Sequence, residues 1–134
     1  MASLLVWLIT AAVFAQRSPV ESASPVQQIH LAMIKPASDA IFNVAREAPK
    51  NAGAWTAVAD AGATLARSGQ LMRLQAPAEK RERWTRLSRQ LTLVGRAAQR
   101  AALARNLEAL THASDRVIIV CETCHAPYRS KSPK

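Results

Sequence analysis

Aromatic residues, glycine and acidic residues are all scarce in this chain. Only six of its 134 residues are aromatic, and it has four glycines and seven prolines. So few turn-forming residues argue against a many-turned β-sandwich and against collagen-like and low-complexity classes. The chain has 9 acidic and 18 basic residues, and its net charge of +9 favours a partner with an anionic surface. The length predicts a single domain.

The N-terminus has no charged side chain over its first fifteen residues. Its apolar run, Ala2–Ala15, is shorter than the roughly 20 residues that a membrane-spanning helix needs. The run ends in small residues before Gln16, which is typical of a secretory signal peptide, although no lysine or arginine follows Met1. We therefore predict a signal peptide over residues 1–15 and a flexible leader over 16–25. An uncleaved short membrane anchor is the alternative.

The rest of the chain, residues 26–129, contains four segments in which apolar residues recur at spacings of three and four, before a C-terminal tail at 130–134. This is the pattern of amphipathic helices, and the many alanines and leucines favour helix as well. Four such helices with short connections predict an all-α fold, an antiparallel four-helix bundle. The four stripes are Val26, His30, Met33, Ala37, Ala40 and Val44; Trp55, Val58, Ala59, Leu65 and Ala66; Trp84, Leu87, Leu91, Val94, Ala98 and Ala101; and Leu107, Leu110, Ser114, Val117, Cys121, Cys124 and Tyr128.

Prolines, glycines and asparagines mark the expected helix ends. Pro36 predicts a kink or a restart within the first helix, because proline removes one backbone donor. Asn51 and Asn106 are expected N-caps of the second and fourth helices. Ser68-Gly69 predicts the end of the second helix, and Gln70–Ala78 is then a connection.

The only two cysteines lie in Cys121-Glu-Thr-Cys124-His125, which has the C-x-x-C-H spacing of c-type haem attachment. Thiols at i and i+3 on a helix point the same way and can form thioether bonds to the two vinyl groups on one haem edge. His125 then reaches the iron as the proximal ligand. Because the fourth stripe runs into both cysteines, we predict one covalent haem c that faces the bundle interior.

Two other chemistries fit the same cysteines. A thiol redox pair of the thioredoxin type lies at a strand-to-helix junction, and no such pattern surrounds Cys121 and Cys124. A zinc site needs further Cys or His ligands, for which only His30 and His112 are available.

At this point the chain resembles the class II c-type cytochromes, meaning cytochrome c′ and its low-spin relatives, in their periplasmic bacterial monohaem branch. The resemblance lies in Cys121–Arg129 near the C-terminus, Pro36–Phe42, Trp55, Trp84 and Ala104–Leu110. It implies a four-helix bundle with its haem site near the C-terminus. It also implies a periplasmic one-electron carrier, or a gas-binding haem protein, and not an enzyme.

The family resemblance also implies that any sixth iron ligand comes from the first helix, usually a methionine. The corresponding position, six residues before the Pro-Ala-Ser-Asp motif, is His30 here, and Met33 follows one turn later. Three hypotheses remain open: ligation by His30, ligation by Met33, or a five-coordinate iron that binds gases. Arg129, in the family's aromatic–arginine pair, is either a partner of a haem propionate or a solvated arginine.

Basic residues fall opposite the apolar stripe of the third helix: Arg86, Arg89, Arg96 and Arg100. They form either a solvated face or a docking surface for an acidic redox partner protein or an anionic membrane surface. The expected export argues against nucleic acid as a partner. The family resemblance adds a homodimer as an alternative.

Overall fold

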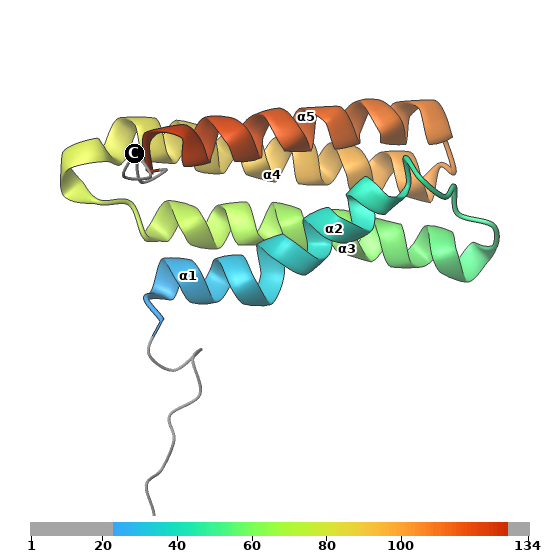
Figure 1. Cartoon of the computed structure of the whole chain (residues 1–134), viewed down its shortest axis with the longest axis horizontal. Coiled ribbons are helices and arrows are strands. Elements are labelled where there is room, and N and C mark those ends of the chain that lie inside the picture. The colour runs from blue at the N-terminus through green and yellow to red at the C-terminus, as the bar shows by residue number, and fades with distance from the viewer. Residues whose placement is uncertain (1–22, 129–134) are drawn as a thin grey trace, which may run out of the picture.

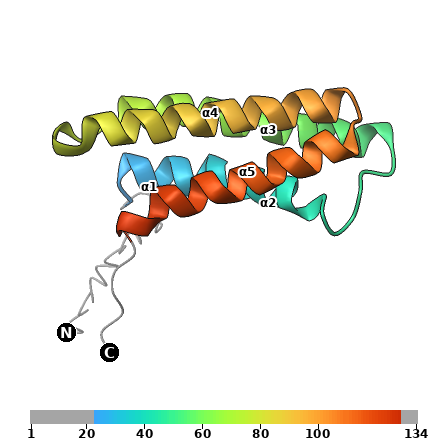
Figure 2. The same cartoon turned by 90° about the horizontal axis from the view of Figure 1, so that it is seen from above.

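The computed structural model describes residues 23–128, which form helices and no β-strand. Its first arm, residues 25–43, consists of α1 (Pro25–Ile29), the π-helix η1 (His30–Ile34) and α2 (Lys35–Asn43). The three long helices are α3 (Ala52–Leu74), α4 (Arg81–Leu103) and α5 (Leu107–His125), with short 3₁₀ turns η2 (Ala78–Lys80) and η3 (Ala126–Tyr128). Figure 1 and Figure 2 show the first arm and the three long helices packed side by side. The all-α prediction is therefore confirmed.

Asparagine side chains begin two of the long helices, as the sequence predicts. The side-chain oxygen of Asn51 accepts a hydrogen bond from the backbone N–H of Ala54 at 2.9 Å, and that of Asn106 accepts one from Ala109 at 3.0 Å. Each asparagine satisfies a donor that the first helical turn leaves unpaired. α1 begins at Pro25, capped by Ser24, so its start lies within the stretch expected to be a flexible leader. The predicted signal peptide and C-terminal tail lie outside the described residues.

Aliphatic side chains from all four helical segments fill the core. The completely buried side chains include Ile41 of α2, Leu65 of α3, and Leu110 and Val117 of α5. Val94 of α4 is 2% exposed. The predicted stripe of α4 is confirmed from Leu87 to Ala101. The first arm is buried mainly through α2, since no residue of α1 is buried.

The prediction that the second helix ends at Ser68-Gly69 is wrong, because α3 continues to Leu74. Both residues are buried, and Gly69 faces α4. A Cβ atom at Gly69 would lie 2.7 Å from the backbone nitrogen of Thr92. The glycine therefore serves close helix packing and not termination, and the connection to α4 shortens to residues 75–80.

Two further glycines allow α3 and α4 to approach each other closely. A Cβ atom at Gly62 would lie 2.5 Å from the backbone nitrogen of Gln99, and one at Gly95 would collide with the backbone of Ala66. Backbone cannot move aside as a flexible side chain can. The helices α3 and α4 are thus a tightly packed pair. The first arm and α5 both pack against one side of this pair (Figure 2).

The first arm changes its hydrogen-bonding pattern just before Pro36. Across η1 the N–H of Lys35 donates to the carbonyl of His30, five residues earlier, and α2 begins directly afterwards. The predicted interruption at Pro36 is therefore confirmed, and its form is a single π-turn.

We expect Gly62→Ala to lower the free energy of unfolding by about 1 to 3 kcal/mol, because the added methyl group overpacks the α3–α4 contact. Denaturation by urea measures the change. Gly53→Ala is the matched control, since its Cβ would meet only the Asn51 side-chain oxygen at 3.4 Å, an ordinary contact. Equal effects of the two substitutions would show that the close helix approach is not limiting.

Candidate functional site

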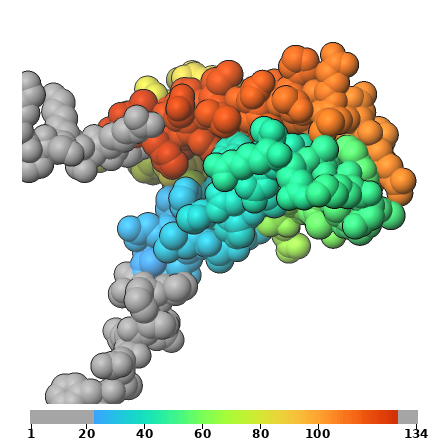
Figure 3. All heavy atoms as spheres, turned by 45° about the vertical axis from the view of Figure 1, so that its right-hand side comes forward, coloured from blue at the N-terminus to red at the C-terminus, as the bar shows by residue number. Residues whose placement is uncertain are grey.

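A pocket of about 420 Å³ opens at one end of the bundle, where the first arm and α4 begin and α3 and α5 end. Figure 3 shows that the α2 part of the first arm packs against α5, whereas the α1 part is separated from α5. The pocket has the size of a small-molecule or cofactor site, and its wall is mostly apolar. It is lined by Val26, Gln27, His30, Leu31, Ile34, Met72, Trp84, Leu87, Ser88, Leu91, Val120, Cys121, Cys124 and His125.

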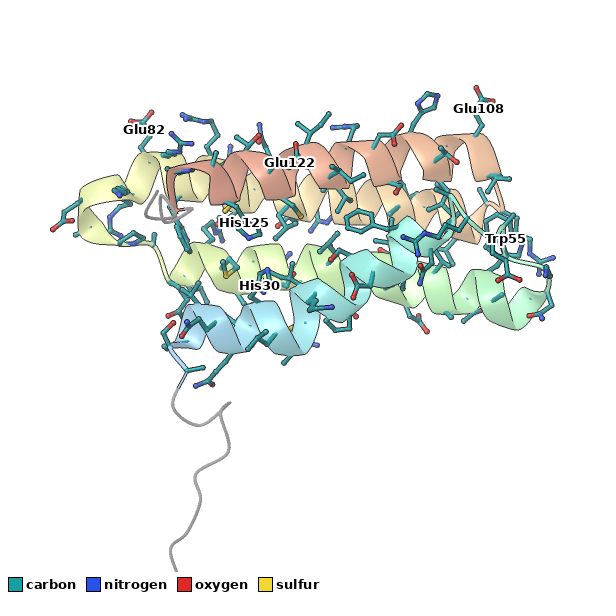
Figure 4. The ribbon with its side chains drawn as sticks, in the orientation of Figure 1. His30, Trp55, Glu82, Glu108, Glu122 and His125 are labelled. Carbon is teal, nitrogen blue, oxygen red and sulfur yellow. The ribbon has the colours of Figure 1, made fainter. Side chains whose placement is uncertain are left out.

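Two imidazole rings face each other across this pocket. His30 comes from η1 and His125 is the last residue of α5; their ring centroids are 5.5 Å apart and their planes are tilted by 57° (Figure 4). Within the described residues neither ring makes a hydrogen bond. Burial lowers the pKa of His30, and the charges of His125 and Lys35 lower it further. The lowered pKa of His30 favours the neutral ring, the form in which imidazole binds a metal.

Both cysteines line the same pocket and are free thiols. Burial raises the pKa of Cys121, and neighbouring Cys124 and Glu122 raise it further. Burial also raises the pKa of Cys124, against a smaller opposing effect of Arg83. A dithiol redox centre instead lowers the pKa of its attacking thiol to generate the thiolate. The pocket therefore favours protonated thiols and is poorly suited to disulfide exchange.

The structure brings four of the six predicted site residues together. His30, Cys121, Cys124 and His125 line the pocket, whereas Met33 does not, and Arg129 lies outside the described residues. The sequence predicts that His30 and Met33 share one helical face. The π-turn widens the helix between them, so that Ile34 and not Met33 follows His30 on the pocket side.

The sequence predicts that Met72 lies in a connection, residues 70–78, where it either covers a haem edge or serves plain packing; the connection is wrong, because Met72 belongs to α3. In the extended α3, Met72 lies two turns after Leu65 on the buried face and is 7% exposed. Its carbonyl accepts a hydrogen bond from the indole N–H of Trp84, which ties the end of α3 to the start of α4. The spacing of seven residues from Leu65 to Met72 is the signal that could have placed Met72 on the buried face of α3.

The predicted basic stripe of α4 is exposed at all four positions, Arg86, Arg89, Arg96 and Arg100. Beside the pocket, Arg83 donates to the carbonyl of Thr123 at 3.4 Å and links α4 to the last turn of α5. Over residues 23–128 no helix combines the length and apolar character needed to span a bilayer. Nor do these residues contain a cluster of three or more His, Cys, Asp or Glu side chains arranged to hold a metal ion.

Comparison of the chain with protein-family models, with curated proteins and with solved structures finds no match.

We expect the thiols of the haem-free chain to react with iodoacetamide more slowly than free cysteine at pH 8. The reason is that burial raises both pKa values and so reduces the fraction of reactive thiolate. The alkylation rate, measured against pH for Cys121→Ala and Cys124→Ala separately, should reach half its maximum above the pH of an ordinary thiol. The same variants in denaturant are the control, and should return to ordinary behaviour. A midpoint below that of free cysteine in the folded chain would contradict this and favour a redox dithiol.

Proposed function

We propose that this chain is an exported class II c-type cytochrome that carries single electrons in a bacterial periplasm. On this proposal it is an antiparallel four-helix bundle with one covalent haem c near its C-terminus. The observation that carries the proposal is the pair of opposed imidazoles, His30 and His125, in an apolar pocket that Cys121 and Cys124 also line. The resemblance described from the sequence supports the same assignment.

The residues of the pocket fit haem c in the chemistry of their side chains. Cys121 and Cys124 have the spacing that the two thioether bonds would need, and His125 and His30 are the two imidazoles that would hold the iron. When bound, the haem iron alternates between the ferric and ferrous states and so stores one electron. The apolar wall, with Leu87 and Val120, would suit the hydrophobic face of the group.

The protein's contribution to electron transfer is to keep both imidazoles in place. Depression of the His30 pKa favours the neutral ring and so avoids competition between a proton and the metal. Ligation by His30 and His125 would give a lower reduction potential than ligation by a methionine and a histidine, because a methionine ligand raises the potential of haem iron. A ligand pair that stays bound in both oxidation states would require little rearrangement when the charge changes, which suits an electron carrier.

The exposed arginines of α4 support a redox partner protein with an acidic surface. Arg89 and Arg96, with Arg73 of α3, line a shallow groove between the two helices. The positive electrostatic field of these arginines would accelerate the encounter with an acidic partner, and added salt would weaken this effect. An anionic membrane surface would use the same charges. Nucleic acid is not a partner that the proposed export allows.

We expect the chain, produced in cells equipped for cytochrome maturation, to carry one haem that survives denaturation. The double variant Cys121→Ala/Cys124→Ala should lose this covalent haem while the helix content stays unchanged, because both thioether bonds need the thiols. Mass spectrometry and the Soret absorption band measure the two forms. A colourless wild-type product with the mass of the bare chain would refute the proposed function.

The sixth ligand is tested by replacing His30. We expect His30→Met to raise the reduction potential and to add the far-red charge-transfer band of a methionine–iron bond. His30→Ala should open the sixth position, and the reduced protein should then bind carbon monoxide. Met33→Leu is the matched control and should leave the spectrum unchanged, because Met33 does not line the pocket. A wild-type protein that already has the methionine band, or that binds carbon monoxide as readily as His30→Ala, would contradict ligation by His30.

A further inference from the structure

The π-turn η1 lies directly before Pro36 and begins with His30. In a continuous α-helix the N–H of residue 36 would donate to the carbonyl of Ala32, but proline has no N–H and its ring crowds that carbonyl. The structure instead pairs the Lys35 N–H with the His30 carbonyl, an i to i+5 bond. Pro36 thus removes the α-helical alternative at the point where the π-turn forms.

The π-turn changes the direction in which the start of the arm faces. A π-turn contains about one residue more than an α-turn, and one residue corresponds to roughly 100° around a helix. α2 is fixed in the core through Ala37 and Ile41, whereas α1 has no buried residue and packs against the core only through the partly buried Val26 and Ile29, so α1 is the part that turns more easily. In an uninterrupted α-helix α1 would be turned by about this angle, which would bring Leu31 toward His125 in place of His30.

We propose that Pro36, through the π-turn that it enforces, is the positioning residue that orients the His30 imidazole toward His125. This inference rests on the proposed function, since it explains which side chain of the first arm becomes the sixth ligand. The same turn directs Met33 away from the pocket. Which side chain of the first arm becomes the sixth ligand then depends on how far α1 is turned about the helix axis, as well as on the presence of a histidine.

The variant Pro36→Ala tests the proposal. We expect the arm to return to α-helix and the bis-imidazole absorption spectrum to be lost, with a five-coordinate iron that binds carbon monoxide when reduced. Pro49→Ala is the matched control, because Pro49 lies in the loop after the first arm, away from the pocket lining. It should leave the spectrum unchanged.

A second variant separates helix phase from general damage. Deletion of the exposed Ala32 in the Pro36→Ala background removes the extra residue, so that a regular α-helix again points His30 at His125 while α2 keeps its place. We expect the bis-imidazole spectrum and the wild-type reduction potential to return. A Pro36→Ala spectrum equal to wild type, or a deletion that restores nothing, would overturn the proposal.

A measurement on the haem-free chain tests the same proposal without haem attachment. Proton–proton contacts between the rings of His30 and His125, measured by nuclear magnetic resonance, should be present in the wild type, absent in Pro36→Ala and restored by the deletion. Persistence of the contacts in Pro36→Ala would overturn the positioning role. Failure of wild-type haem attachment would overturn only the proposed function.

Discussion

Two imidazoles 5.5 Å apart, from helices at opposite ends of the chain, are the contact on which the arrangement of this site depends. They meet beside a mostly apolar wall, where His30 is partly buried and His125 is exposed. The two cysteines on the preceding turn of α5 line the same space. On the proposed function, a group that is apolar over most of its surface would pack against this wall and present a metal to both rings, and this is our reason for proposing haem in preference to a dithiol or a zinc ion.

The tight packing of α3 on α4 provides the rigid side of this pocket. Close backbone contacts at Gly62, Gly69 and Gly95 fix the two helices against each other over most of their length. The Trp84–Met72 hydrogen bond extends this unit to the end where the pocket opens. The histidines come from the other side of the bundle, so the rigid pair forms a wall while the first arm and α5 supply the reactive groups.

Much of the architecture follows from the sequence because burial and capping leave local signals. The stripe from Leu87 to Ala101 and the caps Asn51 and Asn106 could be predicted from spacing and side-chain type alone. The end of α3 could not, since a glycine such as Gly69 can either terminate a helix or admit a neighbouring one, and only the fold decides between the two. The orientation of Met33 was equally inaccessible, because Pro36 signals an interruption without stating whether the helix kinks, restarts or widens.

On the proposed function, the position of His30 near the least buried part of the bundle bears on whether the site acts in electron transfer or in gas binding. α1 has no buried residue and packs against the core only through the partly buried Val26 and Ile29, whereas His125 ends α5, whose stripe is buried as far as Val120. Segments with few buried contacts open locally at the smallest free-energy difference. On the proposed function, the two axial ligands therefore differ in permanence: His125 is fixed by the core and the adjacent cysteines, and His30 by the phase of one π-turn. The distinction between a six-coordinate carrier and an open gas-binding site is then a matter of local helix geometry in the first arm, with the remainder of the bundle unchanged.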